Sequence, residues 1–112
     1  MLLYWWPRCS TCREARQVLH ARGVRPEERD YFAHPLTRDE LRDLAAGAGG
    51  IRRLVATGSP SFRRLGRPLE DLTEAELEAH VLAEPRLLRR PLLRTSGDRV
   101  LVGARAIREA AT

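Results

Sequence analysis

The sequence predicts an α/β domain with a mixed four-stranded sheet, and three observations point to this fold class. A strand, a helix and a second strand follow one another within residues 2–33, an order that makes the two strands parallel. Amphipathic helices follow, and residues 87–111 then indicate a hairpin and a last helix. We expect one domain over residues 1–112, ordered β-α-β, helical insert at residues 37–85, β-β-α.

The N-terminal unit is predicted from apolar runs and the residues that end them. Leu2–Trp6 is a short apolar run, and Pro7 ends it because proline cannot donate to a sheet ladder. Residues 10–22 have apolar side chains at helical spacing, and Gly23 favours the end of that helix. Aromatic side chains within residues 29–33 indicate the second strand.

Two helices of the insert are predicted from capping boxes, in which a threonine hydroxyl and a glutamate carboxylate satisfy free backbone N–H groups. Thr37 with Glu40 begins one helix, and Thr73 with Glu76 begins the other, which Pro85 closes. Apolar side chains at helical spacing follow both boxes. Each helix is therefore expected to bury one face.

The remaining segments complete the predicted order. We expect a short helical turn at residues 51–56 and a loop at residues 57–60. Residues 87–93 and 100–102 are apolar, and the turn-forming residues between them predict an antiparallel hairpin. An amphipathic helix at residues 105–111 ends the domain.

The composition is that of an ordinary globular protein. The chain has 43% hydrophobic and 31% charged residues, without the bias of disordered or collagen-like chains. Its formal net charge is +5, and all 20 basic residues are arginines spread along the whole sequence. Such even use indicates a coding bias rather than a designed patch. We therefore expect weak, salt-sensitive attraction to polyanions, no specific nucleic acid, and a monomer.

The apolar N-terminus is too short for a membrane span and has no basic segment before it, unlike a signal peptide. We expect no membrane partner and a cytoplasmic location. In that reducing compartment, two thiols three positions apart are not expected to form a structural disulfide.

The first predicted strand–helix junction contains the only two cysteines, Cys9 and Cys12. The first backbone N–H groups of a helix have no partner in the helix and stabilise a thiolate there. Arg8 and Arg13 flank the pair and are expected to lower its pKa further. Residues three apart on a helix share a face, so the two sulfurs can form a disulfide. The predicted site is a redox-active dithiol.

Metal binding and an inert structural pair are the alternatives for these cysteines. A zinc site requires four ligands, usually two cysteine pairs or one pair with closely spaced histidines. His20, His34 and His80 are scattered, and there is no second cysteine pair. We therefore expect thiol chemistry and no metal.

Several segments match one known family in order along the chain. They are Tyr4-x-x-Pro7-x-Cys9, Pro35-Leu36-Thr37-x-x-Glu40-Leu41, Phe62-x-x-Leu65-Gly66, Leu72-Thr73-x-x-Glu76-Leu77, Pro85-x-Leu87-Leu88-x-Arg90-Pro91-Leu92-Leu93 and Asp98-x-Val100-Leu101-Val102-Gly103. On these segments the sequence resembles the bacterial arsenate reductase (ArsC) family, which also contains the Spx-type regulators. The resemblance implies a thioredoxin-like fold with a helical insertion.

The resemblance also implies the roles of site residues. In the family the first cysteine attacks an oxyanion, and an arginine before a cis-proline helps to bind it, which gives Cys9, Arg90 and Pro91 here. A guanidinium suits a tetrahedral oxyanion because it offers two parallel hydrogen bonds. The residues expected to bind the oxyanion are Arg8, Ser10, Thr11, Arg13, Arg90 and Arg105.

Other arginines of the family are missing from this sequence. Ala56 stands where glutathione-dependent reductases have an arginine before a threonine, and Gly58 stands where Spx-type relatives have one after it. Gly103 falls where a third reductase arginine is expected, although Arg105 is close. Trp6 replaces a common asparagine. Arginines from other directions are therefore expected to complete the oxyanion cage.

The predicted function is thiol-dependent reduction of arsenate to arsenite, as in arsenic detoxification, with Cys9 as nucleophile and Cys12 as resolving thiol. The implied electron donor is thioredoxin, or glutathione with glutaredoxin, and no bound cofactor is expected. The alternative is an Spx-like redox-sensing transcriptional adaptor that binds RNA polymerase and switches through a Cys9–Cys12 disulfide. A general disulfide reductase is a further alternative.

Overall fold

A computed structural model describes residues 1–111, and a four-stranded sheet forms its centre. The strands lie in the order β2 (Glu27–Asp30), β1 (Leu2–Trp5), β3 (Leu92–Arg94) and β4 (Val100–Val102). β1 is parallel to β2 and antiparallel to β3, which is in turn antiparallel to β4. The predicted mixed four-stranded sheet is confirmed.

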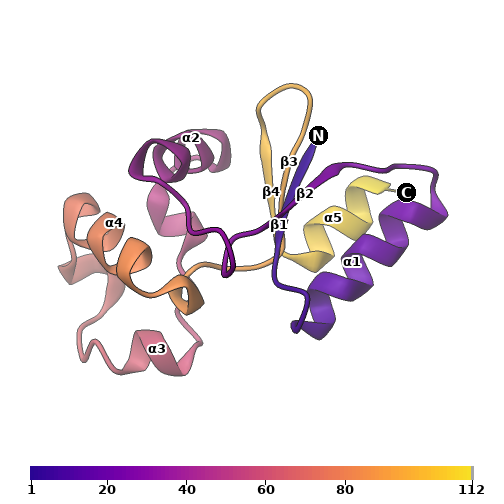
Figure 1. Cartoon of the computed structure of the whole chain (residues 1–112). Coiled ribbons are helices and arrows are strands. Elements are labelled where there is room, and N and C mark those ends of the chain that lie inside the picture. The colour runs from indigo at the N-terminus through magenta and orange to yellow at the C-terminus, as the bar shows by residue number, and fades with distance from the viewer. Residues whose placement is uncertain (112) are drawn as a thin grey trace.

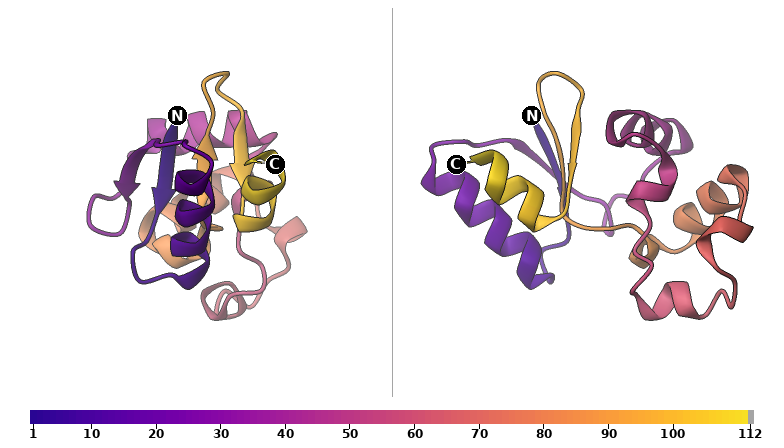
Figure 2. Two further views of the ribbon diagram at one scale, coloured as in Figure 1. Left: turned by 90° about the vertical axis from the view of Figure 1, so that its right-hand side faces the viewer. Right: turned by 180° about the vertical axis from the view of Figure 1, so that it is seen from behind.

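Helices lie on both sides of the sheet (Figure 1). α1 (Ser10–Ala21) and α5 (Ala104–Ala111) pack side by side against one face. The insert lies on the other side, as the two further views also show (Figure 2). Its helices are α2 (Arg38–Ala48), α3 (Pro60–Arg63) and α4 (Glu74–Ala83), with short 3-10 helices η1 (Ile51–Leu54), η2 (Leu69–Asp71) and η3 (Pro85–Leu87) between and after them.

Two apolar clusters form the core, because successive side chains of a strand point to opposite faces of the sheet. The cluster beneath α1 and α5 takes Leu3, Leu93 and Leu101 from the strands. The cluster beneath the insert takes Tyr4, Leu92 and Val100. The sheet therefore joins a dithiol-bearing side to a helical side, and the candidate site forms where the two meet.

The predicted helix starts of the insert are confirmed. The Thr37 hydroxyl accepts a hydrogen bond from the Glu40 N–H at 3.1 Å, and the Glu40 carboxylate accepts one from the Thr37 N–H at 2.9 Å. The capping box of Thr73 and Glu76 has the same two bonds. α2 ends at Gly49, whose φ of 92° is a left-handed conformation that glycine adopts readily.

The second strand lies earlier in the chain than predicted, at Glu27–Asp30 instead of residues 29–33. The Asp30 carboxylate accepts hydrogen bonds from the N–H groups of Phe32 (3.0 Å) and Ala33 (3.1 Å), and this turn ends the strand. The aromatic pair Tyr31-Phe32 therefore leaves the sheet edge. The polar β2 forms by pairing with β1, which strand propensity does not reveal.

The third strand is shorter than the predicted residues 87–93. Leu88 forms an antiparallel bridge with Val55 instead, and the Arg89 N–H donates to the Leu54 carbonyl at 2.7 Å. The segment before Pro91 therefore satisfies its backbone groups against the insert, so only Leu92–Arg94 pairs with β1.

The loop predicted at residues 57–60 is shorter than expected. Pro60 is already the first residue of α3, and the Ser59 hydroxyl caps this helix by accepting from the Phe62 N–H at 3.1 Å. The 3-10 helix η2 was not predicted. Within residues 1–111, none of the helices is long and apolar enough to cross a membrane.

Candidate functional site

Cys9 is the N-cap residue of α1, where β1 gives way to the helix. Its backbone is extended (φ −89°, ψ 120°), and its carbonyl oxygen accepts a hydrogen bond from the Arg13 N–H at 3.1 Å. Its own N–H donates to the Trp6 carbonyl at 2.9 Å. This turn holds the partly exposed sulfur at the N-terminal end of α1, as predicted.

The pKa of Cys9 is lowered to about 7. Burial has the largest single effect and raises the pKa, but several hydrogen bonds together outweigh it. They come from the Thr11 hydroxyl, 3.1 Å from the sulfur, from the thiol and N–H of Cys12, and from the Arg90 guanidinium. An appreciable fraction of Cys9 is therefore thiolate at pH 7, where an ordinary cysteine is almost wholly protonated.

Cys12 has the opposite character. It is fully buried, and burial is the main reason that its pKa rises to about 12. A hydrogen bond from the Trp6 backbone favours the thiolate, but the bond to Cys9 holds Cys12 in the protonated form. Both cysteines are free thiols. The pair thus consists of one partly exposed thiol with a lowered pKa and one buried thiol with a raised pKa.

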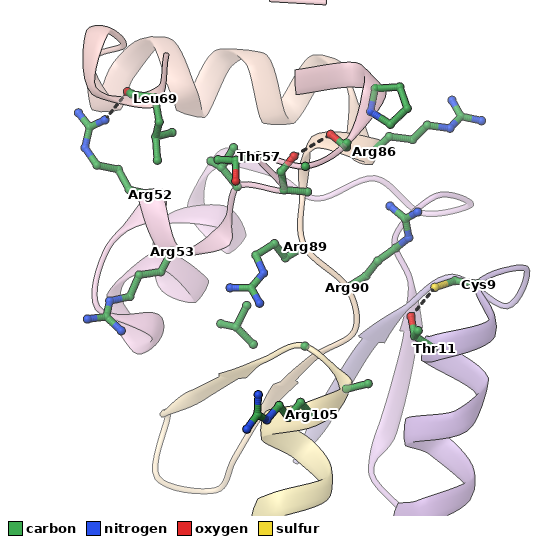
Figure 3. Close-up of a pocket in the computed structure, with 18 residues that line it drawn as sticks. Cys9, Thr11, Arg52, Arg53, Thr57, Leu69, Arg86, Arg89, Arg90 and Arg105 are labelled. Atoms are coloured by element: carbon green, nitrogen blue, oxygen red, sulfur yellow. Dashed lines mark hydrogen bonds between the residues drawn. The ribbon is translucent and has the colours of Figure 1, made fainter. Parts of the chain in front are cut away.

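Arg90 lies beside Cys9 in the segment before β3 (Figure 3). The Arg90–Pro91 peptide bond is cis, as predicted, and Pro91 is buried. The guanidinium carbon lies 5.5 Å from the centroid of the Trp6 ring and 5.7 Å from that of Phe32. None of the ion pairs found within residues 1–111 includes Arg90. Its charge is therefore available to a ligand.

Cys9 and Arg90 border a cleft of about 890 Å³ between the end of the sheet, α5 and the insert (Figure 3). Among residues 1–111, its lining has no acidic side chain but six arginines, which are Arg52, Arg53, Arg86, Arg89, Arg90 and Arg105. Positive charges gathered in a cleft raise the local concentration of anions. The cleft therefore suits an anionic ligand.

The predicted oxyanion ligands divide into two groups. Those that line the cleft beside Cys9 are Thr11, Arg90 and Arg105. Those that are exposed outside its lining are Arg8, Ser10 and Arg13. The Arg13 guanidinium donates to the Pro7 carbonyl at 2.8 Å. Neither Arg8 nor Arg13 is among the main causes of the lowered Cys9 pKa, which corrects the expectation from sequence.

The four other cleft arginines were not predicted. η1 carries Arg52 and Arg53 to the cleft, and the segment before Pro91 carries the rest. Ala56 and Gly58, which replace arginines of the family, also line the cleft, and Arg53 of the preceding turn lines the same space. The Arg52 guanidinium instead donates to the carbonyls of Leu69 and Leu72, at 2.8 and 2.7 Å. The Arg52-Arg53 pair just before the loop was the available signal, and the even use of arginine along the chain hid it.

No three side chains of histidine, cysteine, aspartate or glutamate gather into a metal-binding group in the part of the chain that the structure describes. The donors that surround Cys9 are hydroxyl, thiol and guanidinium groups. Such groups bind anions through hydrogen bonds and charge.

Comparison with known proteins gives both sequence and structural relatives. A profile described as the ArsC family matches residues 4–108. The chain is 34% identical over 94 residues to the regulatory protein MgsR of Bacillus subtilis, covering 83% of this chain and 75% of that protein. It is also 34% identical over 92 residues to the global transcriptional regulator Spx of Listeria monocytogenes, covering 81% and 70%.

Solved structures share the fold along most of the chain. A Yersinia pestis protein, provisionally assigned as an arsenate reductase, superposes with a TM-score of 0.84 at 26% identity and covers 99% of this chain and 98% of its own. An arsenate reductase from Vibrio cholerae superposes with a TM-score of 0.77 at 23% identity, covering 88% and 85%, a likeness of fold alone. The chain thus has a thioredoxin-like fold and belongs to the ArsC family.

Proposed function

We propose that this protein is a thiol-dependent oxyanion reductase whose substrate is arsenate. The observation that carries the proposal is a partly exposed Cys9 sulfur, at the N-terminal end of α1 and with its pKa lowered to about 7, beside a cleft that six arginines and, among the described residues, no acidic side chain line. An anion that enters this cleft meets positive charge before it meets the nucleophile. The provisional assignment of the Yersinia pestis relative supports arsenate as the oxyanion.

In the first step, the Cys9 thiolate attacks the As(V) atom and forms a sulfur–arsenic bond. One arsenic-bound oxygen takes up protons and leaves as water. Arg90 and Cys9 line the same cleft, and Arg90 contributes to the lowered pKa of Cys9, so its N–H groups are close to where the arsenate oxygens would lie. These donors would stabilise the charge that collects on the oxygens during attack.

In the second step, Cys12 attacks the sulfur of Cys9. The electron pair of the sulfur–arsenic bond passes to arsenic, which leaves as As(III) in arsenite, and the two cysteines form a disulfide. Because the Cys12 pKa is raised to about 12, its proton leaves as the sulfur attacks, and the departing arsenite oxygen accepts it. Thioredoxin, or glutathione with glutaredoxin, then returns both thiols to the reduced form.

The test is arsenite formation in two regenerating systems, one with thioredoxin and one with glutathione and glutaredoxin. We expect the wild type to turn over arsenate and Cys9→Ser to be inactive in both. Cys12→Ser should lose the thioredoxin-driven reaction but keep the glutathione-driven one, because glutathione then resolves the adduct. A wild type that forms no arsenite with either donor would exclude the enzyme.

A second candidate function is a redox-sensing adaptor that binds RNA polymerase. It is favoured by the sequence relatives MgsR and Spx, which are both named as regulators. A Cys9–Cys12 disulfide would then act as the switch. Capture of the RNA polymerase α-subunit by the oxidised but not the reduced protein, lost in Cys12→Ser, would support it, and equal capture by both forms would exclude the switch.

A further inference from the structure

Aromatic rings rather than carboxylates hold Arg90. Its Nε is buried with no hydrogen-bond partner in the described chain, and its guanidinium faces both Trp6 and Phe32. These two rings stack on each other with centroids 4.4 Å apart and an interplanar angle of 19°. A cation is attracted to the face of such rings within about 6 Å of the centroid. The stacked pair therefore offers Arg90 one continuous attractive surface.

Tyr31 adds a third ring to this group, 5.0 Å from Phe32 between centroids. Its hydroxyl is buried without a hydrogen-bond partner in the described chain. Burial raises the pKa of Tyr31, and the nearby positive charge of Arg90 opposes that rise only in part. The phenol is therefore neutral and does not provide Arg90 with an ion pair.

Trp6 joins this aromatic support to the dithiol through its backbone. Its carbonyl accepts the Cys9 N–H at 2.9 Å, and its backbone is close enough to Cys12 to oppose the rise of that thiol's pKa. The ring that contacts Arg90 and the backbone that lies beside both cysteines thus belong to one residue.

We infer that Trp6 is a positioning residue that aims the Arg90 guanidinium at the Cys9 sulfur through the face of its indole ring. The inference deepens the proposed function, since it explains how Arg90 is held ready for an oxyanion, but its test does not require arsenate. The Trp6 ring acts through Arg90, whose guanidinium carbon lies closer to its centroid than that of Arg86, at 5.5 against 5.9 Å.

The neighbouring tryptophan provides a matched control. Trp5 faces Arg16 with 5.3 Å between the guanidinium carbon and the ring centroid. Arg16 also forms an ion pair with Glu28 at 2.6 Å, so its position does not depend on the ring alone. Trp5 packs on the other core cluster, beneath α1 and α5. Trp5→Leu therefore removes an indole of the same size without touching Arg90.

The experiment compares alkylation of Cys9 by iodoacetate, which is an anion, with alkylation by iodoacetamide, which is neutral. The ratio of the iodoacetate to the iodoacetamide rate constant rises with positive charge beside the sulfur. Because both reagents react with the thiolate, a change in the thiolate fraction of Cys9 does not alter this ratio. We expect Arg90→Ala to lower this ratio about fivefold, the effect of one unit charge roughly 4 Å away in water. Trp6→Leu should cause most of that loss, whereas Trp6→Phe, which keeps an aromatic face, and Trp5→Leu should keep the wild-type ratio.

The double variant decides whether Trp6 acts through Arg90. If it does, adding Trp6→Leu to Arg90→Ala has no further effect on the ratio, because the guanidinium is already absent. The inference would be overturned if the two substitutions lowered the ratio additively. It would also be overturned if Arg90→Ala alone, or Trp6→Leu alone, kept the wild-type ratio. Phe32→Leu is a second way to remove the support if Trp6→Leu does not fold, and we expect it to lower the ratio as well. A protein that reduces no arsenate would refute the proposed function and leave this result intact.

Discussion

The arginines on the outer face of the insert and the arginines of the cleft have different partners, although the residue type is the same. On the insert, Arg38 and Arg42 both bind Glu78, at 2.9 and 3.0 Å. The cleft arginines that join no ion pair within residues 1–111 are Arg52, Arg53, Arg89 and Arg90. Of these, Arg52 donates to the carbonyls of Leu69 and Leu72 at 2.8 and 2.7 Å, so the charges of the other three are the ones most available to a ligand.

The largest expected effect is a difference in reactivity between the two thiols. At pH 7 iodoacetamide should modify Cys9 more than about a thousandfold faster than Cys12, because only Cys9 is appreciably ionised. The Cys9 rate should rise as pH increases through 7 and level off above it, since the thiolate reacts and its pKa is lowered. Peptide mapping by mass spectrometry at several pH values measures both rates. Equal rates, or a Cys9 midpoint near 9, would contradict the assignment.

The next largest effect is expected from removing an unpaired arginine. Arg90→Ala should lower kcat/KM for arsenate about 10–100-fold, the range for a lost hydrogen bond to a charged group, with little change in thermal midpoint. The exposed Arg64, outside the cleft lining, supplies the control variant Arg64→Ala, which should be as active as wild type. Arg86→Ala at the exposed rim should cost less than Arg90→Ala. Equal losses of kcat/KM in Arg86→Ala and Arg90→Ala would show that Arg90 is not part of the oxyanion site.

Removing a paired arginine is expected to lower stability and leave activity unchanged. Arg29 donates two hydrogen bonds to Glu40, at 2.6 and 3.0 Å, and further bonds to the carbonyls of His34 and Pro35. Arg29→Ala should lower the free energy of unfolding at pH 7 by about 1 kcal/mol, because the pair is partly exposed, and leave kcat/KM unchanged.

The pH dependence of this loss has a definite sign. The hydrogen bond from Arg29 is the main reason that the pKa of Glu40 is lowered in the folded protein. The stabilisation is therefore complete above the ordinary glutamate pKa and disappears as pH falls through the lowered value. Denaturant titrations of wild type and Arg29→Ala should thus converge in acid. A difference that grew towards low pH would contradict the pairing.

The smallest effect is expected at the outer face of the insert. Arg42→Ala should leave the thermal midpoint within error of wild type, because the Arg42 side chain is mostly exposed and Glu78 keeps Arg38. Thermal unfolding followed by circular dichroism is sufficient to measure this. A loss as large as that of Arg29→Ala would show that Arg38 does not compensate for the loss of Arg42 at Glu78.

Local signals were enough to predict most elements of the fold. The capping boxes at Thr37 and Thr73 and the glycine after α2 act within one helical turn, so the sequence displays them directly. The second and third strands were misplaced because contacts distant in sequence decide them. β2 exists by pairing with β1, and Leu88 pairs with Val55 of the insert.

The candidate site likewise has residues that the sequence could predict and residues that depend on contacts distant in sequence. The place of Cys9 at a helix N-terminus follows from the neighbouring residues, and Arg90 with its cis-proline was found through resemblance to the family. Arg52 and Arg53 were not found, because they reach the cleft only once the insert packs beside the sheet. The support of Arg90 by Trp6 and Phe32 likewise depends on the turn at Asp30, which moves the aromatic pair off the strand.

The most direct test of the central claim is a single turnover of fully reduced protein with excess arsenate and no external reductant. Arsenite is quantified, and the state of both cysteines is read by mass spectrometry. We predict one arsenite and one Cys9–Cys12 disulfide per chain for the wild type, and neither for Cys9→Ser. Wild-type protein that yields no arsenite, or arsenite without the disulfide, would contradict a dithiol that delivers two electrons to an oxyanion.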